Sequence, residues 1–306
     1  MINICILKML TLDLLLFRGS YPLPPDASKI LGVEVSGYIE RLGSECSNKF
    51  KVGDKVMALL QGGGYAGYAV SYECTTMHAP IGLDMMTLAS IPEQWITAYQ
   101  LLFLVGKIRQ GETVLLHAAS SGVGQAAIQL AKDAGAKVIA TCRSDDKKDC
   151  CIRLGADIAL NIREVQTFSE LIRSQNNGCG VDLILDCVGG SYTSENFSVC
   201  NVDARWVLYG TMGGRAIHDD GFLGKLMAKR ISILPSTLRG RSKAYKNDLV
   251  HGFEADVVPK IANGTFKVVV SSIHPFTTEG VRNAHKIMSR NENIGKIVLN
   301  ILDDVL

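Results

Sequence analysis

The sequence predicts an α/β protein with two domains, one built on a doubly wound parallel sheet and one rich in short β-strands. The 306 residues exceed the length of one typical domain. Residues 30–80 hold short alternating segments separated by glycines, which is typical of antiparallel strands. From about residue 93, continuous apolar segments alternate with helical ones, as in a parallel sheet covered on both faces.

The composition excludes several classes of protein. Hydrophobic residues make up 47% and charged residues 20%, which argues against a disordered chain, a collagen or a coiled coil. Lys and Arg number 32 against 30 Asp and Glu, too small an excess to favour nucleic acid or an anionic membrane as partner. The sequence contains no run of 18 apolar residues, so it predicts no ordinary transmembrane helix. Nine cysteines without a C-x-x-C pair indicate free thiols in a reducing, cytoplasmic compartment.

The N-terminal third is predicted to be β-rich. MINICILKMLTLDLLLF, residues 1–17, predicts one or two buried strands rather than a signal peptide, because no basic start or cleavage site is evident. Residues 30–43, 50–60 and 62–73 predict further strands with turns at glycines. Short strands of this kind favour an antiparallel barrel or sandwich.

Strands and helices then alternate along the chain. Helices are predicted over 93–106, 122–134, 146–154 and 166–174. Strands are predicted at 113–119, 137–142, 156–162, 181–189, 204–210 and 230–236. After residue 235 the pattern becomes mixed, with a helix over 251–266 that ends at Asn263-Gly264 and a closing strand over 293–302.

The strongest motif is HAASSGVGQAAIQLAK, where a strand gives way to a helix near Gly122. Unpaired N–H groups at a helix N-terminus attract phosphate. The dinucleotide fingerprint G-x-G-x-x-G is incomplete, because its three positions are Ala119, Ser121 and Gly124. The backbone of Gly122, Val123 and Gly124 still predicts a pyrophosphate loop, and simple strand–helix packing is the alternative.

The residues after the second strand of this region predict the choice of dinucleotide. That strand ends at Cys142, where NAD-selective sites place Asp or Glu. Arg143, Ser144 and Lys147 follow, and their guanidinium, hydroxyl and ammonium groups suit a 2′-phosphate. They favour NADPH, although two aspartates nearby also allow a solvated turn of mixed charge.

Together these motifs resemble the zinc-free, zeta-crystallin-like quinone oxidoreductases of the medium-chain dehydrogenase/reductase superfamily. The resemblance runs from about residue 18 to residue 300. The stretches that carry it are YPLPPDASKILGVEVSG, MALLQGGGYAGYAV, IPEQWITAYQLLFLVG, HAASSGVGQAAIQLAK, LILDCVGGSY, RWVLYGTMGG and NIGKIVL.

The resemblance implies a GroES-like catalytic domain, 1–92 and 234–306, split by a Rossmann NADPH-binding domain, 93–233. It also implies a homodimer that reduces quinones, often ortho-quinones, with NADPH. The family begins earlier than this chain, so we expect an N-terminally truncated and less stable catalytic domain. In this register Leu10 stands where the family has an active-site asparagine, and leucine cannot hydrogen-bond a carbonyl.

The resemblance also implies site residues. Tyr21 and Thr97 match catalytic positions, with a packing tyrosine and a helix-interior threonine as the alternatives. Arg239 and Arg241 are candidates to line the cofactor cleft, but as lone arginines they are expected at the surface. The implied cofactor-binding residues are Ser121, Gly122, Val123, Gly124, Arg143, Ser144, Lys147, Cys187, Val188, Gly189, Gly210, Met212, Gly213, Ser271 and Ile273.

No metal is expected. GVEVSG, residues 32–37, places Val33 where a zinc-dependent dehydrogenase has a histidine ligand, and valine has no lone pair to offer. The four-cysteine structural lobe of such enzymes is also missing, and the six histidines show no ligand spacing. The sequence therefore favours hydride chemistry without metal assistance.

Two other functions stay open. A non-catalytic NADPH-binding protein is favoured by Leu10 and the missing strands, and disfavoured by Tyr21. An enoyl or alkenal reductase shares the scaffold, and only the shape of the pocket would separate it from a quinone reductase. An isolated enoyl-reductase module would belong to a much longer synthase chain, of which the sequence itself gives no sign.

Overall fold

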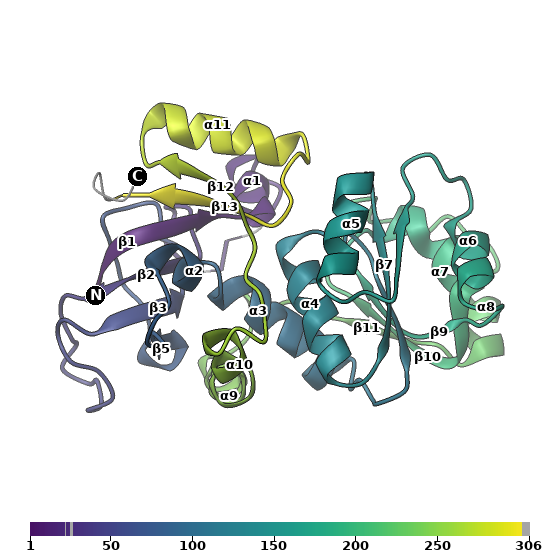
Figure 1. Ribbon diagram of the computed structural model, residues 1–306, viewed down its shortest axis with the longest axis horizontal. Coiled ribbons are helices and arrows are strands. Elements are labelled where there is room, and N and C mark those ends of the chain that lie inside the picture. The colour runs from purple at the N-terminus through teal and green to yellow at the C-terminus, as the bar shows by residue number, and fades with distance from the viewer. Residues whose placement is uncertain (22, 25–26, 302–306) are drawn as a thin grey trace. The chain divides into compact units, whose positions relative to one another are not determined.

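A computed structural model describes residues 1–21, 23–24 and 27–301 (Figure 1). The chain divides into two compact units. Unit 1 comprises Met1–Ile96 with Leu238–Leu306, and unit 2 comprises Thr97–Thr237. The sequence predicts domain boundaries at 92/93 and 233/234.

Unit 1 is built on one sheet with the strand order β12-β13-β1-β2-β3-β5, and β4 pairs with β1. Neighbouring strands are antiparallel, except that β12 and β13 are parallel. The strands are β1 Ile2–Met9, β2 Glu34–Ile39, β3 Lys55–Leu59, β4 Tyr68–Ala69, β5 Thr76–His78, β12 Val270–Pro275 and β13 Lys296–Asn300. The helices are α1 Thr11–Phe17, α2 Met85–Ala89, α9 Lys243–Asp256, α10 Val258–Ala262 and α11 Thr278–Ser289, with a 3-10 turn at Glu73–Thr75.

The first strand lies in the interior of this sheet. β1 pairs with β13 on one side and with β2 and β4 on the other. The prediction of a second strand within residues 1–17 is wrong, because α1 follows directly. The Asp13 carboxylate accepts hydrogen bonds from the Leu10 N–H (2.7 Å) and the Gly32 N–H (3.0 Å), and so anchors the start of this helix.

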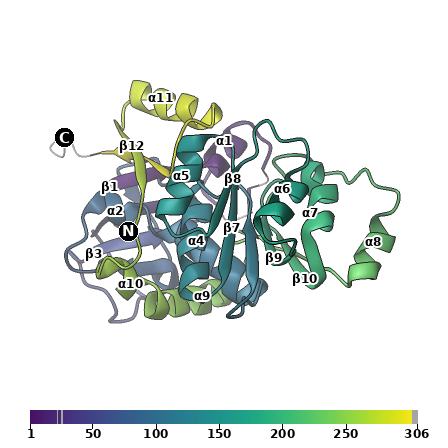
Figure 2. The ribbon, with the colours of Figure 1, turned by 45° about the vertical axis from the view of Figure 1, so that its right-hand side comes forward.

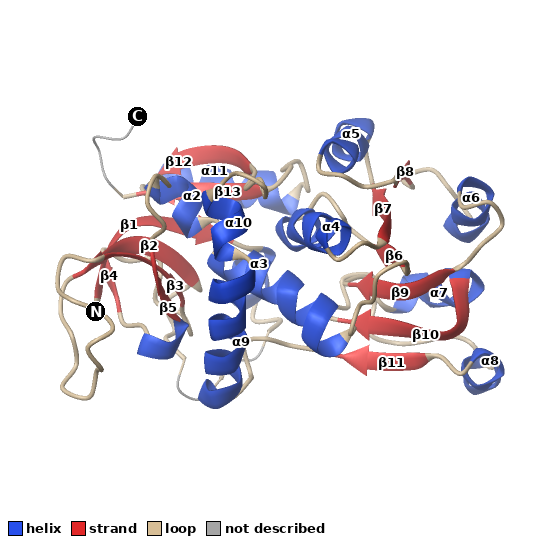
Figure 3. Ribbon diagram, turned by 60° about the horizontal axis from the view of Figure 1, so that its bottom comes forward, coloured by secondary structure: helices blue, strands red, loops and turns tan. Residues whose placement is uncertain are grey.

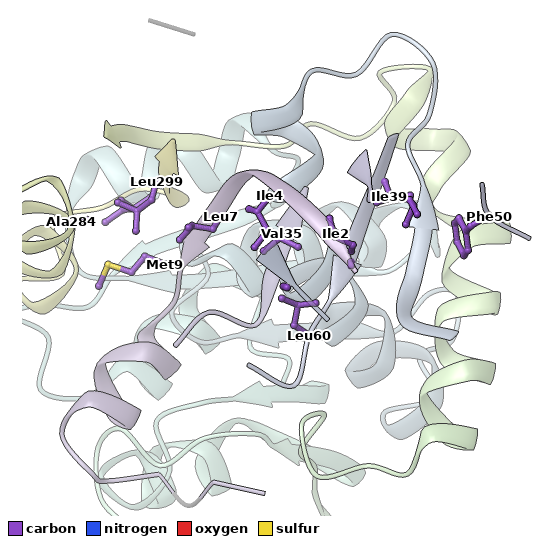
Figure 4. Packing of buried hydrophobic residues seen from close by; sticks show 14 of the residues in the cluster. Ile2, Ile4, Leu7, Met9, Val35, Ile39, Phe50, Leu60, Ala284 and Leu299 are labelled. Carbon is purple, nitrogen blue, oxygen red and sulfur yellow. The ribbon is translucent and has the colours of Figure 1, made fainter. Parts of the chain in front are cut away.

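One face of the sheet carries the apolar core of unit 1 (Figure 4). Ile2, Ile4, Leu7 and Met9 of β1 lie in it, together with side chains from β2, β13 and α11. Residues alternate between the two faces of a strand, so Lys8 lies on the face opposite to Leu7 and Met9.

That opposite face buries charge. The Lys296 ammonium lies 2.8 Å from Glu34 Oε1, with side-chain exposures of 5% and 0%. Glu34 Oε2 accepts a hydrogen bond from the Glu93 N–H (2.9 Å). The Lys8 Nζ is fully buried and has no hydrogen-bond partner among the described residues. Burial, with the nearby Lys296 ammonium, holds the Lys8 pKa well below its usual value, and burial raises the pKa of Asp13 to about 6.

Unit 2 is a parallel sheet with the strand order β11-β10-β9-β6-β7-β8. Helices α4 and α5 lie on one side of the sheet, and α6 and α7 lie on the other (Figures 1 and 3). The strands are β6 Thr113–Leu116, β7 Lys137–Cys142, β8 Ile158–Asn161, β9 Val181–Asp186, β10 Cys200–Leu208 and β11 Ser232–Pro235. The helices are α4 Gly122–Asp133, α5 Asp145–Arg153, α6 Phe168–Gln175, α7 Thr193–Val199 and α8 Phe222–Lys229, with a 3-10 turn at Gly190–Tyr192 (Figure 2).

Two predicted helices differ from the structure in detail. The helix predicted over 93–106 is an α-helix, α3 Pro92–Tyr99, that continues as a π-helix over Gln100–Val105. The helix predicted over 251–266 begins earlier, because Ser242 caps α9, and it breaks at Val257 before Pro259. The predicted end is correct, since Asn263 caps α10 and Gly264 follows with φ of +78°.

Two observations bear on the environment of the chain. The nine cysteines are all free thiols. Among the described residues, no helix combines the length and the apolar character that crossing a membrane requires.

Candidate functional site

The loops predicted to bind a dinucleotide follow four neighbouring strands of unit 2, namely β7, β6, β9 and β10. From β6 the chain proceeds to β7 on one side, whereas β9 lies on the other side and proceeds to β10. The carboxyl ends of β6 and β9 therefore flank a topological switch point, where open parallel sheets bind their ligands.

The loop after β6 exposes backbone N–H groups to which a ligand could come close. Ser121 caps α4, and its hydroxyl accepts a hydrogen bond from the Gly124 N–H (3.2 Å). The Gly122 and Val123 amides lie in the first turn, where N–H groups have no acceptor within the helix. Ala118, not Ala119, adopts the left-handed conformation, with φ of +48°. The predicted fingerprint thus places its tight turn one residue too late.

Gly124 keeps the role of the third fingerprint glycine. A Cβ built there would lie 2.5 Å from the Ala119 Cα and carbonyl oxygen, so α4 could not stay against β6. We expect Gly124→Ala to cost about 1–3 kcal/mol of folding free energy. Urea unfolding of the purified variant measures this loss.

Gly224→Ala is the matched control, because a Cβ there meets no atom within 4 Å and the residue lies inside α8. This control should leave stability unchanged or raise it by up to about 1 kcal/mol. Equal stabilities of the two variants would contradict the packing role of Gly124.

The loop after β7 presents two polar side chains to solvent. Arg143 is exposed and Ser144 is half-buried, and the Ser144 hydroxyl caps α5 by accepting from the Lys147 N–H (3.4 Å). Lys147 differs from the expected clamp residue, because its side chain is buried. Burial, together with the Arg143 guanidinium, lowers the Lys147 pKa. No acidic residue occupies the end of β7, where Cys142 donates its thiol hydrogen to the Leu160 carbonyl (3.4 Å).

The loops after β9 and β10 form one backbone network. The Met212 N–H donates to the Cys187 carbonyl (3.1 Å), and the Gly213 N–H donates to the Val188 carbonyl (2.7 Å). A Cβ on Gly210 would lie 2.7 Å from the Cys187 carbonyl oxygen, so this crossing requires glycine. The structure thus brings together two of the predicted cofactor loops.

The sequence analysis missed Asp186, whose carboxylate accepts hydrogen bonds that support this backbone network. Its Oδ1 accepts from the Val188 N–H (2.7 Å) and the Gly189 N–H (3.0 Å). Its Oδ2 accepts from Asn196 Nδ2 (3.1 Å) and from Trp206 Nε1 (3.0 Å). The available signal was a lone aspartate that ends an apolar strand directly before a glycine-bearing loop.

The remaining predicted site residues occupy less exposed or peripheral positions. Thr97 is buried in α3, at the start of unit 2. In unit 1, Ser271 and Ile273 lie in the end strand β12, and the Ser271 hydroxyl accepts from the Ile294 N–H (3.2 Å).

Tyr21 is half-buried in unit 1 and has an arginine as neighbour. The Arg239 Cζ lies 5.9 Å from the centroid of the Tyr21 ring. The expectation that Arg239 lies at the surface is wrong, because it is 9% exposed, whereas Arg241 is exposed as expected. The buried guanidinium of Arg239 therefore places a positive charge beside the predicted catalytic tyrosine.

No metal centre is apparent in the described part of the chain. No group of three or more His, Cys, Asp or Glu side chains within it could hold an ion. Val33, at the position of the zinc-binding histidine, is buried and aliphatic.

Comparison with known proteins places the chain in a superfamily. Residues 2–90 match the family described as alcohol dehydrogenase GroES-like domain, and residues 122–253 match the zinc-binding dehydrogenase family. Human quinone oxidoreductase is 30% identical over 283 residues, which cover 92% of this chain and 82% of that protein. This chain belongs to the medium-chain dehydrogenase/reductase superfamily.

Other members of the medium-chain dehydrogenase/reductase superfamily are similar over the same span. The structure of Escherichia coli quinone oxidoreductase complexed with NADPH superposes with a TM-score of 0.86 at 25% identity, covering 98% of this chain and 90% of that one. The JamJ enoyl reductase superposes with a TM-score of 0.84 at 26% identity, with the same two coverages.

Much longer synthases also contain a similar segment. The squalestatin tetraketide synthase of a Phoma species is 32% identical over 287 residues. That match covers 90% of this chain but only 11% of the synthase. This medium-chain dehydrogenase/reductase chain therefore spans about a tenth of the length of the synthases it resembles.

Proposed function

We propose that this protein is an NADPH-dependent quinone oxidoreductase that acts without a metal ion. The observation that carries the proposal is the β7–α5 loop, where Arg143 and Ser144 stand in place of the acidic residue of NAD-selective sites. The likeness to human and E. coli quinone oxidoreductases supports the choice of substrate class. We further propose a cytoplasmic homodimer, as the resemblance to that family implies.

The residues of unit 2 fit a dinucleotide phosphate. The Gly122 and Val123 amides, at the positive end of the α4 dipole, would hold the pyrophosphate. The Arg143 guanidinium and the Ser144 hydroxyl would hold the 2′-phosphate. The linked loops at 187–189 and 210–213 would line the path of the cofactor, supported by the four hydrogen bonds to Asp186.

Bound NADPH would supply a hydride from its nicotinamide, and the protein would position the substrate and the cofactor. The Tyr21 hydroxyl would donate a hydrogen bond to a substrate oxygen as that oxygen gains negative charge. Thr97 would position the nicotinamide, and Ser271 and Ile273 would contact its carboxamide, as the family resemblance implies. Lys147, buried behind the loop, would raise the positive potential at the 2′-phosphate rather than bind it directly.

We expect Arg143→Ala to weaken NADPH binding about tenfold and to leave NADH binding unchanged, because only NADPH carries the 2′-phosphate. Fluorescence titration with both dinucleotides measures the two affinities. Arg109→Ala is the matched control, since Arg109 is also exposed but lies before β6, at the opposite edge of the sheet. Equal losses for both dinucleotides would contradict the assignment of Arg143.

An enoyl reductase is the second candidate. The likeness to JamJ enoyl reductase and to a segment of the squalestatin synthase favours it. NADPH oxidation at 340 nm, with 1,2-naphthoquinone and with trans-2-hexenal as substrates, distinguishes the candidates. Faster turnover of the quinone, with NADH much slower than NADPH, is the expected result. Faster turnover of the alkenal would transfer the proposal to the enoyl reductases.

A non-catalytic NADPH-binding protein is the third possibility. Leu10 has a buried side chain and only a backbone hydrogen bond, to Asp13. It therefore offers a substrate oxygen no donor at the position of the family's asparagine. NADPH binding without turnover of either substrate would support this function.

A further inference from the structure

A small cavity in unit 1 combines apolar walls with buried positive charge. It has a volume of about 20 Å³, which is enough for one water-sized group. Leu59, Leu60 and Leu238 form part of its wall, and Arg239 and Lys246 also line it. Neither cation belongs to the predicted cofactor loops.

Arg239 is held in this cavity by one of its three nitrogens. Its Nη2 donates to the Gln61 carbonyl (2.8 Å). Its Nε and Nη1 are buried and have no hydrogen-bond partner among the described residues. A guanidinium carries five N–H donors, and buried donors are normally satisfied. The free N–H groups therefore indicate an acceptor that is not part of the described chain.

Charged groups of both signs surround Arg239, because Lys246 and Glu93 line the same cavity and the Asp13 carboxylate also acts on Arg239. Lys246 is 3% exposed, and its Nζ donates to the Arg239 carbonyl (2.7 Å), so two cations are buried side by side. No ion pair joins Arg239 to a carboxylate within the described residues. Burial lowers the pKa of both residues, and Arg239 adds to the effect on Lys246. Asp13 partly offsets the effect of burial on Arg239, but no described carboxylate accepts a hydrogen bond from its two free nitrogens, and an anion that did so would stabilise the buried charge.

We propose that Arg239 binds the carboxylate of an acidic ligand, beside Tyr21. The room for one oxygen-sized group suits a planar carboxylate that inserts a single oxygen better than a tetrahedral phosphate. Arg239 lies 5.9 Å from the Tyr21 ring, so the carboxylate and the group facing the Tyr21 hydroxyl would belong to one molecule. That the molecule is a substrate rests on the proposed function, and the preferred quinone would then carry a carboxylate.

Binding of benzoate, with benzamide as its neutral isostere, tests this site without turnover. We expect isothermal titration to show saturable binding of benzoate to the wild-type protein and binding of benzamide at least about tenfold weaker. Arg239→Gln should weaken benzoate binding at least about tenfold. Arg241→Gln is the matched control and should bind benzoate as the wild type does, because Arg241 is exposed.

Arg239→Lys keeps the charge and should retain more benzoate affinity than Arg239→Gln, which separates recognition from a folding defect. If Arg239→Gln shows no thermal transition while Arg239→Lys does, the glutamine variant is unfolded. The benzoate affinity of the lysine variant is then compared with that of the wild type. Absence of benzoate binding to the wild type, or equal affinities for benzoate and benzamide, would overturn the proposal. Because no reaction is measured, benzoate binding by a protein that reduces no quinone would refute the proposed function alone.

Discussion

Replacing Glu34 with alanine is expected to destabilise unit 1 by about 3–5 kcal/mol. The change leaves the Lys296 ammonium on a buried face without its carboxylate partner, and it removes the carboxylate that favours the charged form of Lys8. It also removes the carboxylate oxygen to which the Glu93 N–H donates its hydrogen bond. Hydrogen exchange during urea unfolding, followed in β1 for unit 1 and in β6 for unit 2, measures the loss and locates it.

A double variant checks the origin of this loss. Glu34→Met with Lys296→Met removes both charges together, so it should cost clearly less than the two single changes added. Arg230→Ala is the surface control, because its ion pair with Asp203 (2.7 Å) is 65% and 63% exposed. That pair should contribute about 1 kcal/mol or less. Additive effects of the two methionine changes would contradict coupling between Glu34 and Lys296.

Lys8→Met is expected to stabilise the protein by about 1–4 kcal/mol at pH 7. The Lys8 pKa is lower in the folded protein than in the unfolded chain, so folding opposes protonation of this amine. The resulting penalty is absent above the unfolded value of about 10.4 and grows as the pH falls toward the folded value. The advantage of the methionine variant should therefore be largest at neutral pH and shrink as the pH approaches 10.5.

Urea unfolding of both proteins at pH 7, 9 and 10.5 measures this trend. Lys51→Met is the control, since Lys51 is exposed before β3, and its effect should not change with pH. Three neighbouring groups also act on Lys8 or on one another, namely Glu34, Lys296 and Asp13. The comparison of variant with wild type at each pH isolates the lysine. A constant advantage at every pH would show that Lys8 stays protonated when buried.

The sequence predicts unit 2 better than unit 1, for a physical reason. Its strands are continuous apolar runs, so they can be predicted from the local sequence alone. The cofactor loops are then predicted directly after the ends of these strands. In unit 1, α1 was predicted as strand, because a leucine-rich run is compatible with both structures. Only the Gly32 N–H, far along the chain, completes the Asp13 anchor that begins this helix.

The charged groups of unit 1 could not be predicted from local pattern. Arg239 is held by a carbonyl 178 residues away, and Glu34 meets a lysine 262 residues away. Tyr21 and the loops at 122–124 and 143–147 lie in motifs that are local in sequence, which is why the resemblance indicated them. Residues whose role depends on long-range contacts, such as Asp186 with Trp206, require the fold itself.

The pairing of β1 with β13 has a consequence for how the chain is made. The unit 1 sheet joins residues 6–9 to residues 297–300, so the ribosome synthesises β1 long before its neighbour β13. Unit 2 is continuous in sequence and its sheet can assemble while the C-terminal strands are still being translated. Until β13 emerges, one side of β1 has no partner strand. The nascent chain therefore carries an apolar strand with one unpaired edge while the whole of unit 2 is translated, which is the period when chaperone binding would protect it most.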